Sequence, residues 1–122
     1  INFSKKKKNV LFKNSLGRKL YLSLMKIAFV VIGNSSSGVL ETPSFGVRTI
    51  NIGDRQKGRI ITPNIINCDN KYESIKKAFY KVAKKIKKTK NIFLKKNTTR
   101  KIAYKLVNFK FKIKKEFFDI KF

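Results

Sequence analysis

The first two thirds of the chain carry short apolar runs whose spacing alternates between that of strands and that of helices. Four runs predict strands, at residues 9–12, 29–32, 47–53 and 64–68, because apolar residues either fill them or alternate along them. The run at 29–32 is apolar at every position and is followed by Gly33. A continuous apolar run of this length is typical of a parallel strand that is buried on both faces.

Three longer segments have apolar residues three or four positions apart, so we expect amphipathic helices over 15–28, 72–88 and 98–109. In the first helix the face expected to be buried consists of Leu16, Leu20, Leu24 and Ile27. In the second it consists of Ile75, Phe79, Val82 and Ile86, and in the third of Ile102, Leu106 and Phe109. Ser15 is the candidate N-cap of the first of these helices.

The order of the elements indicates the fold class. A short helix is expected over 38–45, with Pro43 near its start and Gly46 after its end, and the tail at 112–122 fits a last helix. Strands and helices therefore alternate along the chain. Such alternation is typical of an α/β fold with a parallel sheet.

The charge of the chain is strongly positive, and its 122 residues are enough for one domain of ordinary size. Lysine and arginine number 31 against 6 acidic residues, which gives a formal net charge of +25. This balance is compatible with a basic nucleic-acid-binding module, or with helices that bind an anionic membrane. The codon bias of an AT-rich genome is the favoured explanation, because Lys, Asn, Ile and Phe are all abundant and Lys far outnumbers Arg.

Residues that carry most enzyme and metal chemistry are scarce. Cys68 is the only cysteine, which excludes an internal disulfide and a zinc–cysteine cluster, and we expect it to be a half-buried thiol. The chain has no histidine, the commonest general base. No apolar run approaches the roughly 20 residues of a membrane span, and the basic start lacks the apolar region of a signal peptide. We therefore expect a cytoplasmic protein and, because Ile1 is not an initiator methionine, a fragment.

The loop between Gly33 and Glu41 is small and uncharged in a chain crowded with lysine. Such a loop at the carboxyl end of a parallel strand leads into a helix N-terminus, where N–H groups and hydroxyls favour an anion. The residues expected to contact a phosphate group are Asn34, Ser35, Ser36, Ser37 and Gly38. Glu41 is expected to accept hydrogen bonds from sugar hydroxyls. The alternative is a loop of capping serines, with Glu41 only complementing the helix dipole.

The same loop does not match a P-loop, because Val39 and Leu40 stand where lysine and serine or threonine are required. After the next strand, the loop at 53–59 supplies Arg55 and Arg59, whose planar guanidinium groups suit phosphate. We expect both arginines to reach the same pocket. An ordinary basic surface loop is the alternative.

Three motifs in succession closely resemble the C-terminal domain of UDP-N-acetylglucosamine 2-epimerases, most of all the hydrolysing type of the sialic and legionaminic acid pathways. They are Gly-Asn-Ser-Ser-Ser-Gly at 33–38, Glu-x-Pro-Ser-Phe-Gly at 41–46 and Asn-Ile-Gly-Asp-Arg-Gln-Lys-Gly-Arg at 51–59. The resemblance implies an α/β, Rossmann-like three-layer domain with a parallel sheet. This domain would be a partial C-terminal half of a GT-B fold, whose active site lies between two domains.

By motif match, Ser35 and Ser36 look like the diphosphate-binding serines of the family, Glu41 like its ribose-binding acid and Arg55 like its nucleotide-binding arginine. The family eliminates UDP to give a 2-acetamidoglucal, then adds water or UDP. Its acid/base carboxylates lie in the N-terminal domain and its histidine early in the C-terminal one. We therefore assign no catalytic residue, no metal and no cofactor to residues 1–122, and expect them to form a single, partial UDP-binding domain.

The resemblance implies a parent enzyme that converts UDP-N-acetylglucosamine, or a related UDP-acetamido sugar, to an N-acetylmannosamine-type sugar and UDP. The chain departs from the family at Phe29, usually Asp, at Arg48, usually Pro, and over 61–63 and 90–99. We expect this chain alone to be catalytically incomplete. Expected partners are UDP or a UDP-sugar, with an N-terminal domain or a second copy of the chain, and neither a specific nucleic acid nor a membrane. The alternative function is the basic nucleic-acid-binding module.

Overall fold

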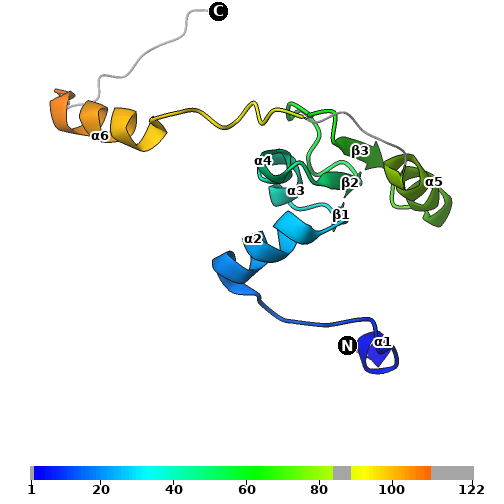
Figure 1. Ribbon diagram of the computed structural model, residues 1–122. Coiled ribbons are helices and arrows are strands. Elements are labelled where there is room, and N and C mark those ends of the chain that lie inside the picture. Colours follow the sequence, from blue (N-terminus) through cyan, green and yellow to red (C-terminus); the bar gives the residue numbers. More distant parts are fainter. Residues whose placement is uncertain (1, 84–88, 111–122) are drawn as a thin grey trace, which may run out of the picture.

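The computed structural model describes residues 2–83 and 89–110 (Figure 1). Its centre is a parallel sheet in the order β1-β2-β3, formed by Val30–Gly33, Arg48–Ile52 and Ile65–Cys68. These strands confirm three of the predicted strands to within one residue at each end. The strand predicted at 9–12 is wrong, because this segment pairs with no strand of the described residues and Leu11 is 79% exposed.

One face of the sheet packs against α5 (Tyr72–Ala83). Alternate residues of a strand point to opposite faces, and Ile50 in the middle of β2 points toward this helix. Ile50 is fully buried and forms a core with Ala78 and Val82 of α5. The predicted amphipathic helix is therefore confirmed up to Ala83, and its remaining predicted residues, 84–88, lie outside the described part of the chain. Val82 is buried as predicted, but the prediction that Phe79 is buried is wrong, since it is 43% exposed.

The opposite face of the sheet packs against α3 (Ser37–Leu40) and α4 (Thr42–Phe45), and α2 (Gly17–Ile27) contacts α4 from outside. Thr49 of β2 points to this face, where its Oγ1 lies 2.8 Å from Oγ1 of Thr42. Helices therefore cover both faces of a parallel sheet, and the predicted three-layer α/β architecture is confirmed (Figure 1).

The first strand is less covered than the sequence predicts. The expectation that residues 29–32 are buried on both faces is wrong, since Phe29 is 55% and Ile32 47% exposed. The reason is that α5 lies over β2 and β3 rather than over β1. Phe29 instead packs edge-to-face on Phe79 of α5, with 6.4 Å between ring centroids, and the guanidinium of Arg48 lies 5.3 Å from the Phe29 ring centre.

The helix predicted over 38–45 is divided in two at Glu41. Pro43 has no N–H to donate to the carbonyl four residues earlier, so the first helix cannot continue through it. The second segment makes shorter-range bonds instead, from the N–H of Ser44 to the carbonyl of Glu41 at 2.9 Å. Gly46 ends it at φ 66°, a left-handed conformation that glycine adopts without steric cost.

The buried side of α2 differs from the predicted one. Leu20, Leu24 and Ile27 are 50, 39 and 79% exposed, whereas Met25 is only 3% exposed. The helix starts at Gly17 after Leu16, so Ser15 is not the N-cap residue, although its Oγ accepts the Gly17 N–H at 3.3 Å. Helical spacing predicted the helix correctly. It predicted the wrong buried face, because the more numerous leucine and isoleucine residues lie on one side and the single buried methionine lies on another.

The two ends of the described chain lie away from the sheet. Figure 1 shows α6 (Thr98–Asn108) joined to the body by an extended segment, and α1 (Asn2–Lys5) on the other side. The helix predicted at 98–109 is confirmed, but its apolar face is not buried, with Ile102 and Leu106 54 and 62% exposed. The predicted tail helix at 112–122 lies outside the described residues.

Candidate functional site

The candidate site lies where β1 and β2 end, because the carboxyl ends of parallel strands meet at one edge of a sheet. The turn after β1 is tightly hydrogen-bonded. The N–H of Ser37 is bonded to Oγ of Ser35 at 3.3 Å, and the N–H of Gly38 to the carbonyl of Ser35 at 3.1 Å. Ser36 is the N-cap residue of α3, yet its side chain makes no capping hydrogen bond. The turn therefore leaves the Ser36 hydroxyl outside helix capping, whereas Ser35 serves the turn.

Glu41 is held by a chain of two hydroxyl groups. Ser37 donates a hydrogen bond from its Oγ to Oε2 of Glu41 at 2.5 Å, and the Tyr21 hydroxyl lies 2.8 Å from the same Ser37 oxygen. A serine hydroxyl has one hydrogen, so Tyr21 donates to Ser37 and Ser37 donates to the carboxylate. This chain fixes the carboxylate, and it commits the Ser37 hydroxyl to Glu41. Tyr21 was not predicted from sequence, because it is one turn before Met25 on the face that the pattern did not favour.

Glu41 lines a pocket of about 270 Å³ that the segment after residue 89 helps to enclose. Nδ2 of Asn91 donates to the carbonyl of Leu40 at 3.2 Å and to Oγ of Ser44 at 2.5 Å. Arg18 of α2 lines the same pocket. Asn91, Phe93 and Leu94, from the segment that departs from the resembled family, therefore lie beside the predicted sugar-binding carboxylate, and Asn91 is a further residue of the site.

The arginine loop meets the serine loop through Gln56, another residue that the sequence reasoning did not single out. Its Nε2 donates to the backbone carbonyl of Asn34 at 2.8 Å, and its side chain is 3% exposed. Arg59 lines a second pocket of about 250 Å³ with Gln56 and Asn51. Neither Arg55 nor Arg59 lines the pocket of Glu41. Ser37 thus contacts Glu41 directly, whereas Asn34 meets the arginine loop through Gln56 and not through Arg55 or Arg59.

The end of β3 carries two titratable groups with perturbed pKa values. A hydrogen bond from the Lys71 N–H, at 2.9 Å, and a bond with Ser74 lower the pKa of Asp69. Burial, and then the charge of Asp69, raise the pKa of Cys68, whose partly exposed thiol agrees with the predicted half-buried state. Cys68 is therefore a weaker nucleophile than an ordinary cysteine at neutral pH.

Two further features are absent from residues 2–83 and 89–110. These residues contain no group of three His, Cys, Asp or Glu side chains that could hold a metal ion. They also contain no helix with the length and hydrophobicity to cross a membrane.

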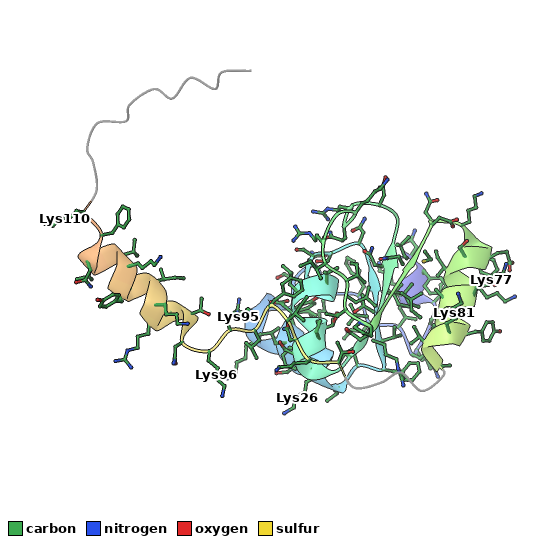
Figure 2. All side chains as sticks on the ribbon, turned by 90° about the horizontal axis from the view of Figure 1, so that it is seen from above. Lys26, Lys77, Lys81, Lys95, Lys96 and Lys110 are labelled. Atoms are coloured by element: carbon green, nitrogen blue, oxygen red, sulfur yellow. The ribbon has the colours of Figure 1, made fainter. Side chains whose placement is uncertain are left out.

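Lysines are distributed over many elements of the described chain. Figure 2 shows Lys26 at the end of α2, Lys77 and Lys81 on α5, and Lys95, Lys96 and Lys110 on either side of α6. Lys110 lies at the opposite end of this view from the labelled lysines of α5, and Lys95 and Lys96 lie between them. A nucleic-acid interface commonly gathers its basic residues on one face, and these six are not gathered in this way.

The three motifs of this site lie within a match to a family model. The model of the UDP-N-acetylglucosamine 2-epimerase family matches residues 1–107. The chain belongs to this family. The resemblance inferred from the serine, glutamate and arginine motifs is therefore confirmed, and the predicted fold class agrees with it.

Curated members of the epimerase family are similar to parts of this chain. The GDP/UDP-N,N'-diacetylbacillosamine 2-epimerase (hydrolyzing) of Campylobacter jejuni is 56% identical over 75 residues, which are 62% of this chain and 19% of that protein. The UDP-N,N'-diacetylbacillosamine 2-epimerase (hydrolyzing) of Legionella pneumophila is 37% identical over 60 residues, 49% of this chain and 16% of the relative. The UDP-N-acetylglucosamine 2-epimerase of Neisseria meningitidis is 38% identical over 61 residues, 50% of this chain and 16% of the relative. The matched part of this chain thus spans less than a fifth of each relative.

Proposed function

We propose that this chain is the UDP-binding part of a hydrolysing UDP-N-acetylglucosamine 2-epimerase. The observation that carries the proposal is the hydrogen-bond chain from Tyr21 through Ser37 to Glu41. It orients a carboxylate at the edge of a pocket, directly after a strand and a serine loop. A carboxylate fixed in this way accepts hydrogen bonds from two neighbouring hydroxyls, as a ribose presents.

We extend the proposal to the other contacts of UDP. The free hydroxyl of Ser36 and the turn of Asn34 and Ser35 bind the diphosphate, and Arg55 approaches its charge from the neighbouring loop. Ser37 orients Glu41 instead of binding phosphate, which revises its predicted role. Gly38 allows α3 to pack closely on β2. Arg59 lines the pocket of Gln56 and Asn51, and we assign it no direct contact with the diphosphate.

The proposed substrate of the whole enzyme is a UDP-linked 2-acetamido sugar. Elimination of UDP, followed by addition of water, needs the leaving nucleotide to be held while the sugar reacts. The described residues serve this purpose, and we place the acid/base groups on an N-terminal domain that faces this one. The proposal for this chain is therefore binding of the leaving group, without a catalytic residue of its own.

Calorimetry with UDP tests the proposed ribose contact through Glu41→Gln. The variant keeps an oxygen that can accept the Ser37 hydrogen, but it loses the charge that strengthens bonds to ribose. We expect affinity for UDP to fall about tenfold to a hundredfold, because hydrogen bonds to charged groups contribute about 1.5–3 kcal/mol. Glu73→Gln on α5 is the matched control and leaves the affinity unchanged.

The same titration with 2′,3′-dideoxyuridine diphosphate separates the ribose contact from general charge. This ligand lacks the hydroxyls, so wild type and Glu41→Gln bind it equally. Equal affinity of the two proteins for UDP itself would contradict the assignment of Glu41. A basic nucleic-acid-binding module, the function suggested by the charge of +25, predicts binding of polynucleotides that survives Glu41→Gln and falls steeply with salt.

A further inference from the structure

Gln56 joins two loops that are distant in the sequence. It follows β2, whereas Asn34 follows β1, and its Nε2 donates to the Asn34 carbonyl at 2.8 Å. A carbonyl oxygen can only accept, so the NH₂ group of the amide must face Asn34. The side chain is 3% exposed, which makes this a bond shielded from water.

The loop around Gln56 is held by its own turns. The N–H of Lys57 bonds the carbonyl of Asp54 at 2.7 Å, and the N–H of Arg59 bonds the carbonyl of Gln56 at 3.2 Å. Because Arg55 lies within the first of these turns, its backbone moves with Gln56. The sheet brings the two loops together as far as the pair Gly33 and Asn51, and the Gln56–Asn34 bond joins them beyond that pair.

The free end of the Gln56 amide does not suit a phosphate. Its Oε1 is buried and has no hydrogen-bond partner among the described residues, and the same holds for Oδ1 of Asn51 in the same pocket of about 250 Å³. Both atoms are acceptors, so they repel an anion and attract a donor such as water. Gln56 consequently acts on a nucleotide through its neighbours and not by touching it.

We propose that Gln56 is a positioning residue, which holds Arg55 against the serine loop so that both contact one diphosphate. The proposal rests on the UDP-binding function proposed above. It extends that function to a residue whose side chain does not touch the nucleotide.

Gln56→Met tests the proposal because methionine has a similar length and no hydrogen-bonding NH₂ group. We expect its affinity for UDP to fall about tenfold, by calorimetry at a temperature where the variant remains folded. Val82→Ala is the control for a loss of stability, because Val82 lies in α5, on the face of the sheet away from α3. We expect this variant to bind UDP as wild type does. An unchanged affinity in folded Gln56→Met would overturn the positioning role and leave the proposed function standing.

A double-mutant cycle with Arg55→Gln identifies the residue through which Gln56 acts. Positioning of Arg55 predicts that Gln56→Met has little further effect on affinity once the arginine is absent. Full additivity of the two losses contradicts the proposal, since it would mean that Gln56 acts independently of Arg55.

Gln56→Glu gives a second variant with a pH signature. A protonated carboxyl donates to the Asn34 carbonyl, whereas an ionised one faces it without a proton. Burial favours the protonated form. The ratio of wild-type to variant affinity should therefore rise between pH 5 and pH 8, and a constant ratio contradicts the proposal.

Amide hydrogen exchange without ligand tests the loop contact separately from UDP binding. Gln56→Met is expected to speed exchange at Ser37 and Gly38 at least fivefold, with exchange in α5 unchanged. If wild type binds no UDP, the proposed function fails, and the positioning role fails with it. The exchange result then shows only whether the two loops are joined. Unchanged exchange at both serine-loop amides overturns the proposal in every case.

Discussion

The close approach of Gly38 to β2 predicts that Gly38→Ala lowers the stability of the fold and that a second substitution, Thr49→Ser, restores it. A Cβ atom added at Gly38 would lie 2.9 Å from Cγ2 of Thr49 and 3.9 Å from its Oγ1. Thr49 is 2% exposed and cannot turn freely, because its Oγ1 is bonded to Thr42 at 2.8 Å. Thr42 gives its hydrogen to the Gly38 carbonyl, so Thr49 must be the donor in that bond. Gly38→Ala therefore creates a collision that a rotation can relieve only by breaking a buried hydrogen bond.

Two opposing terms set the size of the effect. Insertion of a methyl group into a packed interior costs about 1–3 kcal/mol. Alanine in place of glycine gains up to about 1 kcal/mol in a helix, less near its end. We therefore expect Gly38→Ala to lower the free energy of unfolding by about 1–2 kcal/mol. The displaced backbone would be that of the turn that carries the serine loop.

Thr49→Ser removes Cγ2 and keeps the hydroxyl bonded to Thr42. Alone it costs about 0.5–1.5 kcal/mol, as the loss of one buried methyl group does. In this background the nearest remaining atom is the Thr49 oxygen position at 3.9 Å, so Gly38→Ala should be neutral or slightly stabilising. Thr49→Val, which keeps a methyl group in the way, is the matched control and should not rescue.

Urea unfolding of the four proteins measures this coupling, provided that the m-values agree. The expected interaction energy between Gly38→Ala and Thr49→Ser is about 1–3 kcal/mol in the rescuing direction. Equal costs of Gly38→Ala in both backgrounds would refute the argument from close contact. The loss would then have to come from the backbone of α3.

Three further predictions concern the sheet and its edge. Val82→Ala truncates a fully buried side chain next to Ile50, so it should lower the free energy of unfolding in urea by about 2 kcal/mol. An equal loss of unfolding free energy for a surface valine would contradict the assigned core. The pKa of Asp69 is lower in the folded chain than its ordinary value of 3.8, so the ionised carboxylate stabilises the fold. This stabilisation is complete above pH 3.8 and is lost as the pH falls through the pKa of the folded chain. The stability difference between wild type and Asp69→Ala should therefore shrink below about pH 4, and a difference that grows there would reverse the sign. Cys68, whose pKa is raised, should react with iodoacetamide more slowly in the folded chain than in urea at the same pH, and equal rates would contradict its burial.

The sequence predicted elements best where a local pattern is reinforced by packing. The run at 47–53 alternates and the helix after Tyr72 repeats as buried elements do, and Val82 is buried as predicted, against Ile50. The motif residues were also correctly placed at the ends of strands, because chain order alone puts loops after parallel strands at one edge. These features depend on residues that are close in the sequence.

Only the tertiary structure decided which faces and partners these elements have. The pattern of a helix with apolar residues on two sides does not indicate which side packs on the rest of the fold, and in α2 the buried residue is Met25 rather than Leu24. Likewise, α6 has an apolar stripe and no buried residue. A periodic pattern describes a helix surface, whereas burial depends on a neighbour that the local pattern does not specify.

The same distinction applies to the candidate site. The sequence by itself determined that Ser36, Glu41 and Arg55 follow strands of one sheet. It did not determine that Tyr21 holds Glu41 through Ser37, or that Gln56 bonds the carbonyl of Asn34, 22 residues away. Such hydrogen bonds depend on angles, and on distances of a few tenths of an ångström, between segments that are distant along the chain. The residue types of the site are therefore determined by its motifs, and its geometry is determined by the packing of α3 on the sheet, of α2 on α4, and of the two loops on each other.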